Sequence, residues 1–187
     1  MAELARRRRL FVGIALDGAA RARCAAISER LAQTGFDGRY EAPEKLHVTL
    51  AFLGNVDDAA VPPVIAALGE SAAGRVPFSL TLDRLGAFPH ERKPRVVYLG
   101  AREQGAAFRG LAAAARRAYE PLGFPFEKDA VAHVTIARVK EARRPLPNVE
   151  FAPIALAVAS LALFESIFDA KANTSRYEVV DSVALGS

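Results

Sequence analysis

Cysteine is almost absent from this chain, and long hydrophobic runs are absent altogether. Of the 187 residues only Cys24 is a cysteine, so no internal disulfide can form, and we expect it to pack within a helix. The apolar stretch Leu10–Leu16 follows a run of arginines but is stopped by Asp17, too early for a membrane span. We therefore expect a cytoplasmic protein with no membrane partner.

Metal ligands and nucleotide-binding loops are scarce as well. A zinc site normally takes three or four ligands, whereas this chain has three histidines and one cysteine, and neither of the histidine motifs described below contains a carboxylate. No glycine-rich loop of the kind that cradles the phosphates of ATP is present. We expect neither a metal nor another cofactor.

Apolar and basic residues, by contrast, are plentiful. Hydrophobic residues make up 51% of the chain, enough for a real core, and the net charge of +4 favours an anionic partner without identifying one. The basic residues cluster at 6–9, 92–95 and 138–144. Each cluster taken alone is typical of a solvated surface.

One short pattern occurs twice. His47–Leu50 reads His-Val-Thr-Leu, and His133–Ile136 in the second half reads His-Val-Thr-Ile. Both lie in runs of β-favouring residues, and in a strand the His and Thr of each copy share one face while the apolar residues share the other. The repetition indicates two similar halves that face one another and bring two histidines to one site.

Alternating strands and helices surround these motifs. Strands are expected at 9–16, 46–53, 76–82, 95–99, 131–139 and 177–185, and the range 151–165 is expected to hold one bent strand or two strands. Three helices are expected: the first at 19–33, the second beginning after an N-cap at Asp57 or Asp58, and the third at 103–119. The ranges 36–45 and 84–94 are expected to be loops. Several strands alternate apolar and polar residues, which is typical of a sheet with one covered face and one open face.

This order predicts an α+β fold. We expect residues 1–187 to form a single bilobal domain of duplicated sheet-and-helix units, with antiparallel sheets that face a central cleft. Each lobe would contribute one His-x-Thr-x motif to that cleft.

Two histidines and two threonines suit phosphoester cleavage. Of the pair His47 and His133, one imidazole can activate water while the other, protonated, gives its proton to the departing oxygen. The hydroxyls of Thr49 and Thr135 would hold the non-bridging phosphate oxygens. Arg138 would add a cation, although its odd offset from His133 leaves its face of the strand undetermined.

Other candidates have simpler interpretations. A single His-x-Thr in a strand is more often a half-buried polar pair than a catalytic one, but two copies with matched apolar neighbours reverse that expectation. His90 stands alone in a charged segment, and we expect it at the surface. Phe11, Phe52 and Tyr98 are expected in the core or in the groove wall rather than as platforms for a nucleotide base.

Leu46–Gly54 and His133–Arg138 resemble the paired signature of the two-histidine phosphoesterase superfamily, in particular of its RNA 2′,3′-cyclic phosphodiesterases, the LigT-like enzymes first called 2′-5′ RNA ligases. The likeness covers nearly the whole chain. Arg9–Ile14, Pro94–Gly100 and Leu163–Ser166 resemble the opening, middle and late strands of the family.

The resemblance implies a metal-independent enzyme that hydrolyses 2′,3′-cyclic phosphate ends of RNA to 2′-phosphomonoesters. By that likeness His47 is the general acid toward the ribose 3′-oxygen and His133 is the general base that orients water, while Thr49, Thr135 and Arg138 bind phosphate. In reverse, the same site could join a cyclic end to a 5′-hydroxyl without ATP. The partner would be RNA with a cyclic end or a related nucleotide, and the chain a monomer.

Two alternatives remain open. The chain could be a module that binds RNA ends without turnover, although motifs in both halves argue against this. It could also be a phosphodiesterase for another cyclic phosphate, such as that of ADP-ribose, or for 2′-5′ oligonucleotides.

Overall fold

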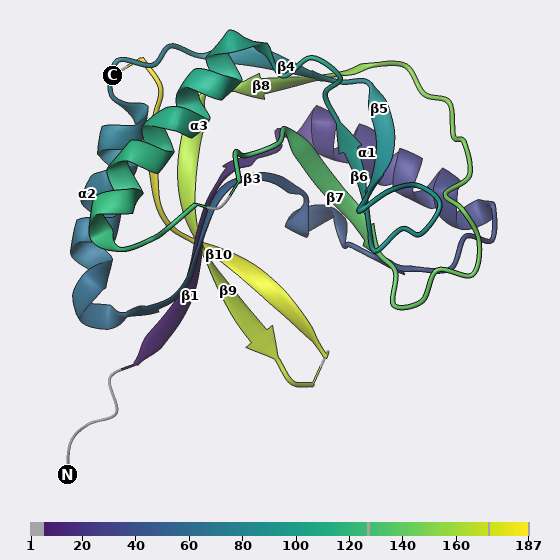
Figure 1. Ribbon diagram of the computed structural model, residues 1–187, viewed down its shortest axis with the longest axis horizontal. Helices are drawn as coiled ribbons and strands as arrows, with labels where there is room; N and C mark the ends of the chain where they lie inside the picture. The colour runs from purple at the N-terminus through teal and green to yellow at the C-terminus, as the bar shows by residue number, and fades with distance from the viewer. Residues whose placement is uncertain (1–5, 127, 172, 187) are drawn as a thin grey trace.

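Two β-sheets and three α-helices make up the part of the chain that the computed structural model describes, residues 6–126, 128–171 and 173–186 (Figure 1). The strands are β1 (Arg7–Ala15), β2 (Arg39–Tyr40), β3 (His47–Asp57), β4 (Phe78–Leu82), β5 (Arg84–Phe88), β6 (Val96–Gly100), β7 (His133–Arg138), β8 (Ile154–Val158), β9 (Ser160–Asp169) and β10 (Thr174–Ala184). The helices are α1 (Gly18–Gln33), α2 (Val61–Ala72) and α3 (Gly105–Tyr119), with short 3₁₀ turns at Pro43–Lys45, Asp58–Ala60 and Glu120–Leu122. The α+β class is confirmed.

The larger sheet is antiparallel, and its two central strands carry the two motifs. Its order is β10-β9-β1-β3-β7-β6-β5, with β2 paired to β7. We call β10-β9-β1-β3 the His47 half and β7-β6-β5 with β2 the His133 half. The register between β3 and β7 contains one pair, Val48 with Val134, and both side chains are 0% exposed. The two halves therefore meet directly beside the histidines.

The helices cover the sheet in a crossed arrangement. Helix α1 follows β1 of the His47 half but packs against β7 and β8, whereas α3 follows β6 of the His133 half but packs against β3 and α2 (Figure 1). The small sheet β4-β8 packs against α3 through β4 and against α1 through β8. One hydrophobic core thus runs beneath both halves, and it ties them together.

Local chemistry explains the first helix. The carboxylate of Asp17 accepts a hydrogen bond from the Ala20 amide at 2.8 Å, as an N-cap residue should. The helix ends at Gln33 with Thr34 as its C-cap, and Gly35 follows with a φ of +73°, a conformation that favours glycine. Cys24 is fully buried on the inner face, so its expected packing role is confirmed.

A matched irregularity follows each motif. Leu50 and Ala51 are both buried where a regular strand would alternate, and so are Ile136 and Ala137. The register with the neighbouring strand shifts at these positions in both halves, which is the mark of a β-bulge. Each bulge turns the following residues over to the other face of the sheet.

Two predicted loops contain strands. Within 36–45, Arg39 and Tyr40 pair with β7, and Pro43–Lys45 forms a 3₁₀ turn. Within 84–94, Arg84–Phe88 pairs with β6 over its whole length. Gly86 is typical of a loop in the sequence, but the ring of Tyr98 lies across it in the sheet, and a Cβ there would come within 2.7 Å of the ring.

Other expected boundaries were also wrong. Neither Asp57 nor Asp58 caps α2, whose N-cap is Ala60; Asp57 instead pairs with Arg7 at 2.8 Å across the sheet. Strand β3 continues past Gly54, which has a φ of +72° within the strand. For 151–165, by contrast, the two-strand alternative is confirmed: β8 pairs with β4 in the small sheet, and β9 pairs with β1 and β10 in the larger one.

None of the helices in the described ranges is long and apolar enough to span a membrane.

Candidate active site

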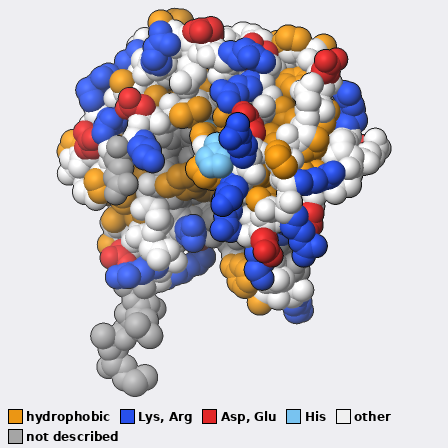
Figure 2. Space-filling view, turned by 45° about the vertical axis from the view of Figure 1, so that its right-hand side comes forward, with side chains coloured by type: hydrophobic (Ala, Val, Ile, Leu, Met, Phe, Trp, Pro, Cys, Tyr) orange, Lys and Arg blue, Asp and Glu red, His pale blue; other side chains and the backbone are white. Residues whose placement is uncertain are grey.

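A cavity of about 580 Å³ lies over the junction of the two sheet halves. His47 and Thr49 from β3 and His133 and Thr135 from β7 all line it, so the structure brings the two motifs to one place. Basic side chains surround it as well, and Figure 2 shows a histidine at the surface among several Lys and Arg side chains. The polar faces of the two motifs open to this cavity, while Val48 and Val134 are sealed in the core.

The antiparallel register relates the two motifs by a local two-fold axis. Because Val48 pairs with Val134, His47 lies across from Thr135, and Thr49 lies across from His133. Each imidazole therefore has hydroxyls beside it and across from it. An anion between the strands could be contacted from both sides.

Both imidazoles are anchored in the same way. Nδ1 of His47 lies 2.7 Å from the carbonyl oxygen of Lys45, and Nδ1 of His133 lies 2.8 Å from that of Val131. A carbonyl can only accept, so Nδ1 carries the hydrogen in each ring, and the neutral imidazole has its free lone pair on Nε2. Nε2 of His47 is 2.9 Å from the hydroxyl of Thr49.

Arg138 reaches the cavity because of the bulge in β7. With Ile136 and Ala137 both directed inward, the fifth residue after His133 returns to the histidine face. This resolves the facing of Arg138, which the strand period alone left open. The same bulge in β3 brings Phe52, the fifth residue after His47, to the cavity, where its side chain is 69% exposed.

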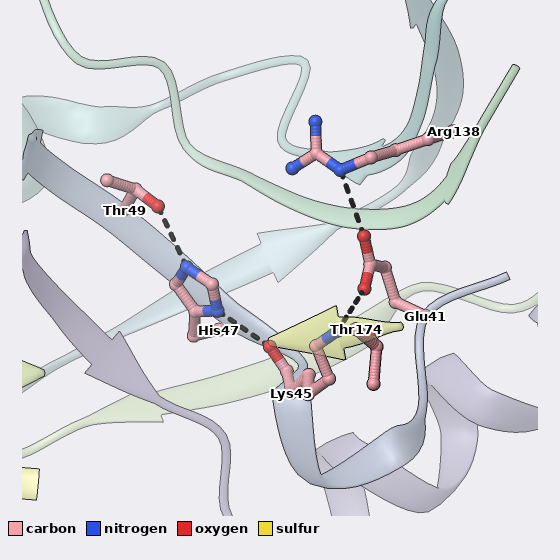
Figure 3. A network of polar contacts seen from close by, with 6 residues as sticks. All are labelled: Glu41, Lys45, His47, Thr49, Arg138 and Thr174. Atoms are coloured by element: carbon pink, nitrogen blue, oxygen red, sulfur yellow. Dashed lines mark hydrogen bonds and ion pairs between the residues drawn. The ribbon is translucent and has the colours of Figure 1, made fainter. Parts of the chain in front are cut away.

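A buried carboxylate connects the two halves (Figure 3). Oε1 of Glu41 accepts a hydrogen bond from Nε of Arg138 at 3.0 Å, and Oε2 lies 3.1 Å from Nζ of Lys45. Lys45 also donates to the hydroxyl of Thr174 at 3.0 Å. Glu41 and Lys45 were not predicted, because Glu41 lay in an expected loop and no motif marked either residue.

The surroundings lower the pKa of both histidines. Burial is the main cause for each, and the hydrogen bond from Nδ1 to a carbonyl opposes it. The charge of Glu41 further opposes the lowering at His47, whereas Arg138 adds to it at both rings. In the free protein near neutral pH both imidazoles are therefore mainly uncharged.

Aromatic rings form the wall behind each histidine. Phe11 lies 4.8 Å from the His47 ring and Tyr177 lies 5.2 Å from it, centroid to centroid. Phe88 and Tyr98 stack at 4.5 Å beside His133. Phe11 and Tyr98 are thus wall residues as expected.

The remaining candidates lie elsewhere. His90 is exposed and does not line the cavity, as expected for a surface residue. Within the described ranges, no three His, Cys, Asp or Glu side chains are grouped so that they could hold a metal ion. The pKa of Cys24 is raised to about 12, chiefly by burial, so its thiol stays protonated.

The chain matches a known family model twice in succession. The model, described as LigT like phosphoesterase, matches residues 14–98 and again residues 99–171, so each match contains one histidine motif. The chain belongs to this family. The two matches also agree with the internal repetition seen in the sheet.

Relatives of known name agree with this membership. The chain is 37% identical over 133 residues to a protein of Archaeoglobus fulgidus named RNA 2′,3′-cyclic phosphodiesterase, in a match that covers 71% of this chain and 73% of the relative. It is 30% identical over 162 residues to a protein of the same name from Thermotoga maritima, with 84% and 86% covered.

Solved structures of similar proteins have the same architecture. The protein TT0787 of Thermus thermophilus matches with a TM-score of 0.83 at 28% identity, covering 95% of this chain and 97% of that chain. LigT of E. coli, in a complex with 3′-AMP, matches with a TM-score of 0.76 at 27% identity, covering 97% and 100%. The LigT-like fold therefore extends over nearly the whole described chain.

Proposed function

We propose that this LigT-like phosphoesterase hydrolyses 2′,3′-cyclic phosphate ends of RNA to 2′-phosphomonoesters. The observation that carries the proposal is the pair of His-x-Thr motifs across the Val48 and Val134 pair, with each Nδ1 anchored and each motif open to one cavity. The names of the relatives supply the substrate class. Each sheet half would contribute one motif within a single bilobal domain.

The reaction breaks the bond between phosphorus and the ribose 3′-oxygen. Nε2 of His133 takes a proton from water as the water oxygen attacks phosphorus, and Nε2 of His47 gives a proton to the departing 3′-oxygen. The products are a 2′-phosphomonoester and a free 3′-hydroxyl. Attack and departure occur on opposite sides of phosphorus, which suits two imidazoles related by the local two-fold axis.

Three further side chains would bind the reacting group. The hydroxyls of Thr49 and Thr135 would donate to the non-bridging oxygens, and Arg138 would offset the charge that grows on them in the transition state. The cavity is lined by basic side chains at Arg9, Arg39 and Lys45, which would attract the RNA backbone. In reverse, the same groups could join a cyclic end to a 5′-hydroxyl.

The test is product analysis with a panel of cyclic phosphates. We expect RNA with a 2′,3′-cyclic end to give a 2′-phosphate, identified by ³¹P NMR and by resistance to a 3′-specific phosphatase, with turnover unchanged by a chelator. Cyclic mononucleotides, ADP-ribose cyclic phosphate and a 2′-5′ linked dinucleotide complete the panel. Tight binding of RNA ends without any product would instead support a binding module. Cleavage of only one of the other panel compounds would show that the substrate is that class of phosphodiester and not an RNA end.

The pH profile offers a second check. One imidazole must be neutral and the other charged, so kcat/KM should give a bell-shaped curve. Because burial lowers both pKa values below the ordinary 6.5, the maximum should lie on the acid side of that value. A flat profile between about pH 5 and pH 9 would contradict a two-histidine mechanism.

A further inference from the structure

Glu41 is a charged group in the cavity that the mechanism above does not use. Its side chain is only 8% exposed, and its two oxygens are occupied by two cations, Arg138 of β7 and Lys45 of the turn before β3 (Figure 3). Burial alone would raise the pKa of this carboxyl, but Lys45 and Arg138 together lower it below the ordinary value. Glu41 is therefore a negative charge at neutral pH, and it is the sole carboxylate among the described residues that line the cavity.

The partners of Glu41 are the places where the two motifs differ most. Lys45, two residues before His47, corresponds to Val131 before His133. Arg138, five residues after His133, corresponds to Phe52 after His47. Since Val131 and Phe52 carry no charge, a carboxylate at the symmetry-related place would find neither cation. The two-fold relation of the scaffold is thus broken at the contacts that Glu41 makes.

We propose that Glu41 is a positioning residue that makes the two related histidines unequal, by holding Arg138 and Lys45 in place and by assigning the proton to His47. This deepens the proposed function and rests on it. Because both oxygens of Glu41 are taken by Lys45 and Arg138, it acts through these neighbours.

Its first effect is to aim Arg138. Glu41 takes the Nε hydrogen of the guanidinium, and Figure 3 shows the two terminal nitrogens pointing away from the carboxylate. Those nitrogens stay free to bind a phosphate as a planar pair of donors. Without Glu41 the half-exposed Arg138 side chain would sample other rotamers, and the pair of donors would be aimed less often.

Its second effect passes through Lys45 to His47. The ammonium of Lys45 is held by Glu41 and Thr174 and lies 5.5 Å from the centre of the Tyr177 ring. The backbone carbonyl of the same residue accepts the Nδ1 hydrogen of His47. Fixing the side chain of Lys45 therefore also steadies the carbonyl that sets the tautomer of His47.

The charged and titratable groups around His47 decide the sign of the electrostatic effect. They come from the turn before β3, from β7, from β10 and from the cavity rim: Glu41, Lys45, His133, Arg138, Tyr177, Arg9 and Arg39. Glu41 is the one anion in this set, so its removal leaves no charge that favours an imidazolium. The pKa of His47 must then fall, because burial already lowers it and its one opposing charge is gone.

The test compares Glu41→Gln with wild-type protein by two readouts. In ¹H–¹³C NMR of the free protein, we expect the titration midpoint of His47 to move down by roughly 0.5 to 1 pH unit while that of His133 moves much less. In turnover, kcat/KM should fall by roughly tenfold or more, and the alkaline limb of its pH profile should move to lower pH.

Two further variants keep the test falsifiable. Glu44→Gln removes an exposed carboxylate from the turn that contains Lys45. It should leave the titration midpoints of His47 and His133 and both limbs of the pH profile of kcat/KM unchanged. Glu41→Asp keeps the charge but is one methylene shorter, so the alkaline limb should stay near the wild-type position while kcat falls. An unchanged His47 midpoint in Glu41→Gln, an equal shift in Glu44→Gln, or a shifted limb in Glu41→Asp would each overturn the proposal.

The NMR readout separates this proposal from the proposed function. If wild-type protein cleaves no cyclic phosphate, the proposed function fails, but a selective shift of His47 still shows that Glu41 makes the histidines unequal. If wild-type protein is active and the midpoints of Glu41→Gln match the wild type, only the role of Glu41 fails.

Discussion

The His47 half and the His133 half present the same backbone with different side chains around it. In both, a histidine donates from Nδ1 to the carbonyl two residues earlier, a threonine follows on the same face, and a β-bulge turns the fifth residue back toward the cavity. The side chains at that fifth place differ: Phe52 is aromatic and Arg138 is a cation.

This difference shows that the placement of the two histidines and their acid and base roles have separate structural causes. The duplicated strands and bulges account for how two imidazoles come to share one cavity, since the same pattern operates twice. They do not account for which imidazole gives a proton and which takes one, because a symmetric pair has no preference. The inequality that we propose comes from side chains that the two motifs do not share, Arg138 and Lys45, together with Glu41, which holds them.

The largest effect should come from removing either histidine. We expect His47→Ala and His133→Ala each to lower kcat by ~10²- to 10⁴-fold, the usual scale for loss of a general acid or base. Single-turnover assays on RNA with a cyclic end measure this. His90→Ala, at an exposed site away from the cavity, is the control and should keep wild-type turnover. Near-normal activity in either motif variant would rule out the paired mechanism.

The next effect should come from the cation that one half has and the other lacks. Arg138→Met should lower kcat by ~10²-fold, because the charge on the non-bridging oxygens grows in the transition state. Arg138→Lys should retain a higher kcat than Arg138→Met but stay below the wild type, since an ammonium cannot offer two coplanar donors. Arg143→Met at an exposed position outside the cavity is the matched control. A loss confined to KM would show that Arg138 binds the ground state only.

The two threonines should have similar, smaller effects. Thr49→Val and Thr135→Val each remove one hydroxyl, and a hydrogen bond to a charged group is worth about 1.5 to 3 kcal/mol, which corresponds to roughly 10- to 100-fold in kcat/KM. Thr81→Val on an exposed position of β4 should change nothing. Because only Thr49 is hydrogen-bonded to its own histidine in the described structure, its variant should also alter the NMR titration of His47. Equal titration curves in both variants would contradict this distinction.

The smallest effect is expected at Phe52. The sequence favoured a core or wall residue here over a platform for a base, but the ring is exposed in the cavity lining. If it stacks on a nucleotide base, Phe52→Leu should raise KM by about fivefold, the low end for loss of base stacking, and leave kcat nearly unchanged. The control is Phe168→Leu on β9, where a phenylalanine of similar exposure lies outside the cavity. A fall in kcat instead of a rise in KM would place Phe52 in the chemistry.

Much of the framework could be predicted from local patterns. The alternation in His47–Leu50 and His133–Ile136 predicted their strands and faces, and Asp17 and Gly35 marked the ends of α1, because each depends on neighbours in the chain. The strand in 84–94 was missed because glycine and prolines indicated a loop. A glycine is needed at position 86 because the Tyr98 ring on the neighbouring strand leaves no room for a Cβ, and no local signal in the sequence reveals this contact.

The sequence by itself determined that two histidines, each with a threonine beside it, would lie on the polar faces of two strands, because strand periodicity is a local property. Only the tertiary structure decided that Arg138 joins them, since a bulge set by pairing with β6 changes the face of the strand. It also decided that Glu41 holds Arg138 and Lys45 together. Glu41 and Lys45 are only four residues apart, but Arg138 is 97 residues from Glu41 in the chain. That contact can form only once the two sheet halves have met at Val48 and Val134.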